Sequence, residues 1–339
     1  RRAAYFDGLL RVLQVLNIDY DMADLNTVSP DELSGYKQVW AFATDEMDEA
    51  AQQTIVDYVS EGGNAVIYPY LPDRDMSQRP CTVLRDAVAV SPSGTEVTVS
   101  PLVDILASND VKCSNPQAVF SEESLSGSEI IARTINGAPC GFAKPLGKGV
   151  VTHLGTWIGF DTAGHKPVYE AILERSGAVL RHAWSDNENI TVRERFAGGR
   201  AMLFIANYYN EGHTGSVSYT HPETGETIRM PMLRSQTDWP PLYGILTPVC
   251  LQVTEGLKIL HATSDILDFK YNGRFLQVIL SGDRDMTGEI VFEGLNAAKI
   301  TSANISGRSL EIIRTGERTL LAYEHEHRKE IVLTIEISQ

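Results

Sequence analysis

Two glycine-led stretches decide the fold: Gly147-Lys-Gly-Val-Val-Thr-His-Leu-Gly-Thr-Trp-Ile-Gly-Phe-Asp161 and Glu61-Gly-Gly-Asn-Ala-Val-Ile-Tyr-Pro-Tyr-Leu-Pro-Asp-Arg-Asp75. In each stretch a glycine turn leads into an apolar, β-branched run, which stops abruptly at polar, loop-forming residues. Short apolar runs bounded in this way are typical of strands that lie buried inside a sheet. We therefore expect both stretches to supply buried strands.

The rest of residues 1–183 alternates helical and strand patterns, which predicts a parallel sheet covered by helices. We expect helices over residues 5–16 and 166–176, and strands over residues 37–43, 65–70 and 150–157. Residues 86–146 differ, because Pro, Ser, Gly and short β-branched runs predict a β-rich insertion rather than further βα units.

The helical period disappears in residues 184–339, where short β-branched runs alternate with turn residues. Asn272-Gly273 is a favourable hairpin turn. This pattern predicts a β-sandwich region. A Pro-rich stretch near residues 237–247 could divide it into two small modules.

Composition excludes several functional classes. The chain has 339 residues and a net charge of −15, which argues against binding to nucleic acid or to an anionic membrane. No apolar run approaches the roughly 20 residues that a membrane-spanning helix needs. Cys81, Cys113, Cys140 and Cys250 form no C-x-x-C pair, which favours free thiols and a cytoplasmic location. We expect no cofactor and no metal.

Together, the two opening stretches resemble the domain that follows the catalytic barrel in β-galactosidases of glycoside hydrolase families 35 and 42. Residues 253–267, Val-Thr-Glu-Gly-Leu-Lys-Ile-Leu-His-Ala-Thr-Ser-Asp-Ile-Leu, are similar to the β-domain of family 35-like enzymes, including archaeal exo-glucosaminidases. The resemblance implies a flavodoxin/amidotransferase-like α/β domain that has lost amidotransferase chemistry. No thiol follows the strand that ends at Tyr68-Pro69-Tyr70, where an amidotransferase would carry its nucleophile.

The amphipathic pattern begins within the first residues of the chain, so we expect Arg1 to be an internal position of a longer polypeptide. Flavodoxin-like sheets begin with a central strand that precedes the first helix. We therefore expect a strand upstream of Arg1, or a rearranged sheet in which Ile18 to Met22 closes the gap.

No residue of the chain is expected to be catalytic. Retaining glycosidases use two glutamates about 5 Å apart on a barrel of roughly 250 residues. Asn187-Glu188 resembles the acid/base dipeptide, but it lies in a polar loop before a strand. His325 and His327 could face one side of a strand and hold zinc, although a solvated polar strand explains them better because no third ligand is assignable.

The candidates for contact with substrate lie at the carboxyl ends of the predicted parallel strands, where open α/β sheets place ligand-facing loops. They are Asp73, Arg74 and Asp75 after one strand, and Trp157, Phe160 and Asp161 after another. An aromatic face beside carboxylates suits a pyranose ring and its hydroxyls. The alternative is that Trp157 is core packing and Asp73 caps a loop.

The sequence thus predicts a non-catalytic accessory and oligomerisation region of a retaining, β-galactosidase-like glycoside hydrolase. Its expected partners are a catalytic barrel segment, further copies of the chain and a carbohydrate substrate. The alternative is a stand-alone carbohydrate-binding or sensor protein that uses the α/β domain, without hydrolytic activity. The chain alone is predicted to be inactive.

Overall fold

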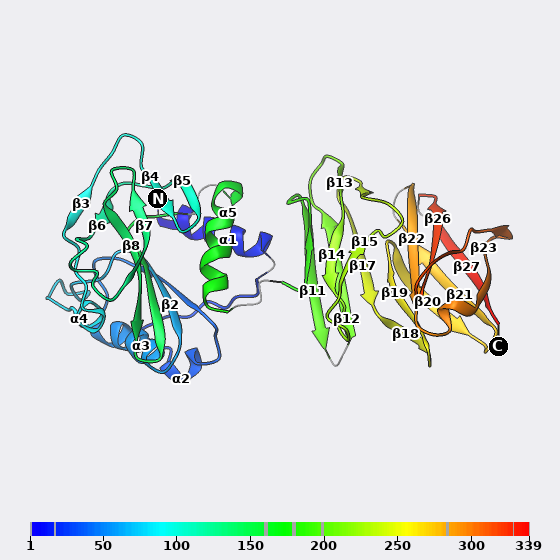
Figure 1. Ribbon diagram of the computed structural model, residues 1–339, viewed down its shortest axis with the longest axis horizontal. Helices are drawn as coiled ribbons and strands as arrows, with labels where there is room; N and C mark the ends of the chain where they lie inside the picture. The colour runs from blue at the N-terminus through cyan, green and yellow to red at the C-terminus, as the bar shows by residue number, and fades with distance from the viewer. Residues whose placement is uncertain are drawn as a thin grey trace. The chain divides into compact units, whose positions relative to one another are not determined.

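The computed structural model describes residues 2–16, 18–158, 162–177, 181–197, 200–282, 285–327 and 329–338. The chain divides into two compact units, Arg1–Leu180 and Arg181–Gln339, and most of its regular structure is β-strand (Figure 1). In the part of the chain that the structure describes, no helix combines the length and the apolar character that a membrane crossing requires.

The first unit is built on one seven-stranded sheet. Its strands, in spatial order, are β1 (Val39–Ala43), β2 (Asn64–Pro69), β9 (Gly149–Leu154), β8 (Pro139–Leu146), β7 (Glu129–Thr134), β4 (Leu102–Ile105) and β5 (Ser108–Lys112). Only β1, β2 and β9 are parallel to one another, and every other neighbouring pair is antiparallel. A separate two-stranded sheet joins β3 (Gly94–Glu96) to β6 (Gln117–Val119).

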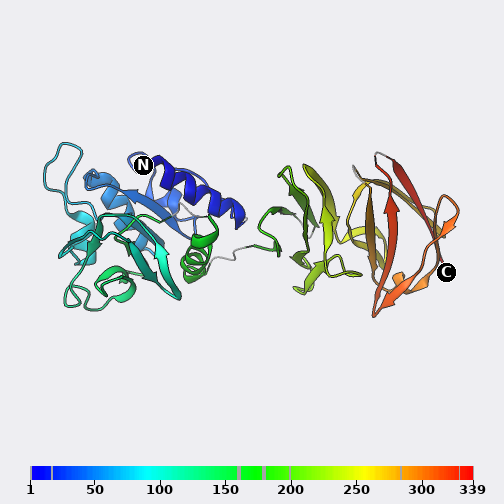
Figure 2. The same cartoon turned by 90° about the horizontal axis from the view of Figure 1, so that it is seen from above.

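Each face of the seven-stranded sheet has its own apolar core, because alternate residues of a strand point to opposite faces. Val66 and Tyr68 of β2 pack in the core that contains Leu9 of α1 (Arg2–Val15) and Ile172 of α5 (Thr162–Arg175). Ile67 packs in the other core, with residues of α2 (Pro30–Leu33), α3 (Glu49–Ser60) and α4 (Val83–Val88). Figures 1 and 2 show α1 and α5 side by side.

The prediction of a flavodoxin/amidotransferase-like parallel α/β domain is wrong. Residues 86–146 are no separate insertion, because they supply β4, β5, β7 and β8 to the same sheet and make it mixed. The physical reason is the short connection between β8 and β9, in which Gly147 adopts a φ of 60°. A turn this short can join only antiparallel strands, whereas parallel strands need a long crossover.

The sheet has no gap that a further central strand would have to fill, and the expected strand upstream of Arg1 stays a prediction. The sheet runs from β1 to β5 through hydrogen-bonded neighbours with no gap, and all its strands come from residues 39–154. Residues 18–22, the possible substitute, form no strand.

The second unit is formed by short antiparallel strands. Three small sheets contain β10 (Ala183–Ser185), β14 (Val217–Thr220) and β15 (Thr227–Met230); β11 (Ile190–Ala197), β12 (Arg200–Asn207) and β17 (Tyr243–Val249); and β13 (His213–Gly215) and β16 (Thr237–Trp239). One five-stranded sheet has the order β18 (Leu251–Thr254), β19 (Leu257–Ala262), β22 (Met286–Glu293), β26 (Arg318–His325) and β25 (Ile313–Thr315). The other has the order β20 (Asp265–Tyr271), β21 (Phe275–Ser281), β27 (Glu330–Ile337), β23 (Ile300–Ile305) and β24 (Arg308–Ser309).

The sheet that contains β19, β22 and β26 is the middle layer of this unit. Ile290 of β22 packs with Val278 and Leu333 in the core between the two five-stranded sheets. Its neighbour Val291 points to the opposite face and packs with residues of the small sheets, such as Tyr219. Two cores therefore fix the second unit, and the middle sheet contributes to both.

Candidate functional site

The loop after β2 carries the predicted residues Asp73, Arg74 and Asp75, and the structure ties it to the loop after β1. The backbone N–H groups of Asp73 and Arg74 both donate to the carbonyl oxygen of Asp45, at 3.0 and 3.2 Å. The Asp73 carboxylate accepts from Arg74 Nε at 2.9 Å and lies 3.2 Å from a terminal nitrogen of Arg85. These contacts occupy the Asp73 carboxylate within the fold.

Asp75 closes the turn that follows. Its Oδ1 accepts from the backbone N–H groups of Ser77 (2.8 Å) and Arg79 (2.9 Å), and its Oδ2 accepts from Arg79 Nε (2.7 Å). The hydrogen bond from the Arg79 backbone is the largest cause that lowers the pKa of Asp75, against the opposing effect of burial. Asp75 therefore has a structural role as the acceptor that orders this turn.

Trp157 lies in an aromatic cluster beneath α1. Its ring stacks on Phe42 with centroids 5.8 Å apart, and it meets Tyr68 edge to face at the same distance. Trp157 is only half-buried. Phe160 and Asp161, the other candidates on this loop, lie outside the described residues.

Among the candidates that the structure describes, Trp157 and Asp73 belong to opposite sides of the sheet. Trp157 packs in the core on the α1 side of the sheet. Asp73 pairs instead with Arg85 of α4, and the neighbouring Leu84 belongs to the core on the opposite side. These residues remain individual candidates at the carboxyl ends of β2 and β9.

A cluster of possible metal ligands occurs in the second unit, where the sequence analysis identified no site. The side-chain ligand atoms of His221, Cys250 and Glu293 all lie within 4.8 Å of one another. His221 Nε2 is 2.9 Å from Glu293 Oε2 and 3.1 Å from Cys250 Sγ. The three residues are far apart in the sequence, so only the fold could reveal the cluster.

The hydrogen bonds of His221 disfavour a metal there. Its Nδ1 is 3.2 Å from the backbone N–H groups of both Glu223 and Thr224, so Nδ1 accepts and the neutral ring carries its proton on Nε2. A metal would have to displace that proton from Nε2, the nitrogen that faces the other two groups. Burial also raises the pKa of Cys250 to about 12, which favours the thiol over the thiolate that a metal requires.

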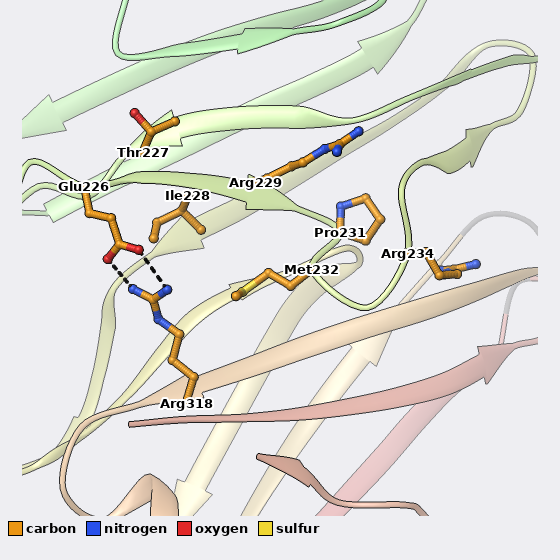
Figure 3. A pocket seen from close by; sticks show the side chains of 8 residues that line it. All are labelled: Glu226, Thr227, Ile228, Arg229, Pro231, Met232, Arg234 and Arg318. Carbon is orange, nitrogen blue, oxygen red and sulfur yellow. Dashed lines mark hydrogen bonds and ion pairs between the residues drawn. The ribbon is translucent and has the colours of Figure 1, made fainter. Parts of the chain in front are cut away.

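The cluster continues through Arg318 to a surface pocket of about 240 Å³ (Figure 3). Arg318 Nε donates to Glu293 Oε1 at 3.0 Å, and its terminal nitrogens donate to both oxygens of Glu226 at 3.1 and 2.6 Å. Figure 3 shows this pair at one end, with Ile228, Met232 and Pro231 across the middle. Hydrogen bonding from Arg318 lowers the pKa of Glu226, so this carboxylate stays ionised.

The arginines at the other end of this pocket are also engaged. Arg234 donates to the carbonyl oxygen of Thr287 at 2.7 Å, and Arg229 lies 3.5 Å from the Asp186 carboxylate. The pocket therefore has apolar side chains between arginines that already bind groups of the protein itself. It offers no positioned acid or base for chemistry.

The other residues considered for chemistry are also accounted for. Glu188 is exposed in the loop that leads to β11. The side chain of Asn187 caps that loop, because its Oδ1 accepts from the Asn189 N–H at 2.9 Å. His325 is buried with Nε2 2.5 Å from Ser264 Oγ, whereas His327 is exposed beyond the end of β26.

Comparison with known proteins shows that this chain is similar to parts of glycoside-hydrolase-like proteins. The model of a family described as "GLMA-like, second domain" matches residues 1–125. A β-1,2-glucosyltransferase of Ignavibacterium album is 28% identical over 63% of this chain. An exo-β-D-glucosaminidase of Thermococcus kodakarensis is 24% identical over 91% of it. The chain spans 29% and 38% of these two relatives, about a third of their length.

Solved structures share the fold at low sequence identity. A β-galactosidase from Bacillus circulans sp. alkalophilus aligns with a TM-score of 0.53 and 18% identity, over 72% of this chain and 36% of its own. A cold-adapted β-galactosidase from Rahnella sp. R3 aligns with a TM-score of 0.54 and 17% identity, over 71% of this chain and 36% of its own. The similarity to glycoside-hydrolase-like proteins is thus visible in both sequence and fold.

Proposed function

We propose that this chain is a non-catalytic accessory region of an enzyme of the family 35/42 β-galactosidase or exo-glucosaminidase kind, which removes terminal β-linked sugars. The observation that carries the proposal is the extent of the match. The chain aligns with 27–38% of each relative whose name denotes chemistry on β-linked sugars. Because the chain matches only this fraction of each relative, most of such an enzyme, including its catalytic segment, would lie outside the matched region.

The carboxylates of the chain support the same reading. A retaining glycosidase needs one glutamate that is protonated and one that is free to attack. Glu226 and Glu293 approach each other only through Arg318, which both of them bind. Hydrogen bonding from Arg318 lowers the pKa of Glu226, so this carboxyl is poorly suited to serve as the general acid.

The partners of the region follow as part of the proposal. A catalytic barrel segment supplies the two glutamates, and the region supports that barrel and the assembly of the enzyme into a homo-oligomer. The carbohydrate substrate is bound mainly by the barrel.

The test is an activity assay of the purified chain with nitrophenyl β-galactoside and nitrophenyl β-glucosaminide. We expect no turnover above the buffer rate. Turnover that disappears in Glu188→Gln or in Glu226→Gln would contradict the proposal, because it would place the chemistry in this chain. Asp31→Asn, a change of an exposed side chain on helix α2, is the matched control for loss of a surface carboxylate.

A further inference from the structure

A second pocket, of about 250 Å³, opens on the outer face of the sheet that contains β20, β21 and β27. Its lining is described by six side chains: Lys270, Tyr271, Asn272, Phe275, Gln277 and Thr334. Lys270, Phe275, Gln277 and Thr334 lie on the face opposite the apolar core, because their neighbours Leu276, Val278 and Leu333 are fully buried in that core. Tyr271, which pairs with Leu276, is partly buried against the core at the end of the sheet. The lining thus comes from paired strands, apart from Asn272 in the hairpin turn.

Polar side chains cross the floor of this pocket in one row. Lys270 of β20 pairs in register with Gln277 of β21, and Gln277 pairs with Thr334 of β27. Asn304 of β23 continues the row beside Thr334. Directly opposed residues of neighbouring strands lie about 5 Å apart, so the strand register fixes the spacing of these groups.

The polar groups at the centre are available to a ligand. Within the described residues, neither the Gln277 amide nor the Thr334 hydroxyl takes part in an intramolecular hydrogen bond. An amide and a hydroxyl each both donate and accept, which is what a sugar hydroxyl requires. The pocket therefore has a polar, uncharged centre.

The hairpin turn between β20 and β21 holds the aromatic wall in place. Asn272 Oδ1 accepts from the backbone N–H groups of Arg274 (3.1 Å) and Phe275 (2.8 Å), and Tyr271 donates its hydroxyl to the Gly273 carbonyl at 2.9 Å. Phe275 is 37% exposed, with the Arg274 guanidinium 5.1 Å from its ring centre. The exposed part of this ring, at the end of the turn, can pack against the apolar face of a pyranose.

Charge and polarity decide between ligand classes. An anion would need several cations, but Lys270 is the only cation of the lining and lies 4.0 Å from the Asp268 carboxylate. A protein partner would be expected to meet an apolar centre with a polar rim, whereas here the centre is polar and the wall is aromatic.

We propose that this pocket binds a terminal unit of a neutral saccharide, as a non-catalytic carbohydrate site. The ligand class follows from the lining itself, whereas the biological role of the site rests on the proposed function above. The site would hold the sugar chain near an enzyme that processes it, without contributing to bond cleavage.

Titration calorimetry of the whole chain with cellotetraose and lactose tests the proposal. We expect saturable binding, and an affinity about tenfold weaker in Gln277→Leu/Thr334→Val, because two hydrogen bonds are lost. Both replacements suit outward strand positions, so the fold should persist, and the melting temperature verifies this. Glu330→Gln, which lies on β27 like Thr334 but outside the lining, is the matched control and should bind the sugars like the parent chain.

Absence of saturable binding of both sugars at concentrations up to roughly 10 mM would overturn the proposal. So would binding that the double variant leaves unchanged, or tighter binding of glucuronate than of either neutral sugar. Turnover of a nitrophenyl glycoside by the chain would instead contradict the proposed function and leave the binding site intact. The two failures are therefore distinguishable.

Discussion

At the scale of single residues, His153 makes the free energy of unfolding of the first unit depend on pH. The side chain is fully buried on β9, and the rings of Phe120 and Phe142 lie 5.5 and 5.4 Å away. Burial lowers its pKa to about 3. The unfolded chain, with a histidine pKa of about 6.5, therefore binds more protons than the folded chain between these pH values.

We expect the free energy of unfolding to fall as the pH decreases from about 6.5 to about 3, by up to about 1.4 kcal/mol per pH unit. His153→Phe removes the titrating group from an aromatic environment and should flatten this slope. Urea denaturation at pH 7 and pH 4.5 measures the change in the free energy of unfolding between these pH values. His182→Phe, a change of an exposed histidine, is the control, and equal slopes in the two variants would refute the assignment.

Glu289 differs from His153 in that it is buried in its charged form, as an anion that links two parts of the second unit. It is 1% exposed and accepts from His261 Nε2 at 3.0 Å and from the backbone N–H groups of Met232 (2.7 Å) and Leu233 (2.6 Å). Burial raises its pKa, but these hydrogen bonds, led by that of His261, outweigh burial and lower the pKa overall.

Glu289→Gln should therefore lower the free energy of unfolding at pH 7 by about 2–4 kcal/mol, because a charged acceptor of three hydrogen bonds is lost. A lowered carboxyl pKa contributes stability above the unfolded value of about 4.5 and loses it as the pH falls further. The difference from the parent chain should thus shrink at pH 3. Glu324→Gln, an exposed glutamate on β26, should cost little at either pH.

At the scale of elements, the glycines of the opening stretch set how closely α3 approaches β9. A Cβ at Gly149 would lie 2.0 Å from the Gly63 carbonyl oxygen and 2.4 Å from the Val59 carbonyl oxygen. Both obstacles are backbone atoms, so no side-chain rotation relieves the clash. We expect Gly149→Ala to cost about 3 kcal/mol of stability.

The control for this prediction is Gly35→Ala, because no atom lies within 4 Å of a Cβ at that position. Thermal unfolding followed by circular dichroism measures both variants. A melting temperature for Gly149→Ala equal to that of Gly35→Ala would show that the helix end can move away.

The sequence located the elements of the first unit better than their pairing. The strand expected over residues 65–70 is observed as Asn64–Pro69, and the helix expected over residues 5–16 as Arg2–Val15. Apolar periodicity reports which residues are buried, but it says nothing about which strand lies next to which. The alternation of helical and strand patterns predicts a parallel sheet, and this prediction is wrong because β4, β7 and β8 pair antiparallel with their neighbours.

The pockets of the second unit were less predictable still. The hairpin turn at Asn272-Gly273 could be predicted, because Asn-Gly is a favoured turn dipeptide. In the structure Gly273 adopts a φ of 93°, which glycine accepts most easily. The row of Lys270, Gln277 and Thr334 could not be predicted, since strand register across three strands places these residues together. No local pattern encodes that register.

At the scale of the whole molecule, each compact unit has cores of its own. The cores of the first unit use residues between Leu9 and Leu173, and those of the second use residues between Ala183 and Ile337. No buried cluster within the described residues mixes the two units. Since apolar burial supplies most of the cooperativity of folding, each unit should unfold as its own transition.

Scanning calorimetry of the chain should therefore resolve two transitions. Ile55→Ala removes a fully buried side chain from the first unit, and Leu333→Ala does the same in the second. Each should destabilise its own unit by about 2–5 kcal/mol, the usual cost of such a truncation, and lower only one of the two transition temperatures. If each variant lowered both transition temperatures equally, the units would fold as a single cooperative body, and stability measured on the chain could not be assigned to either unit alone.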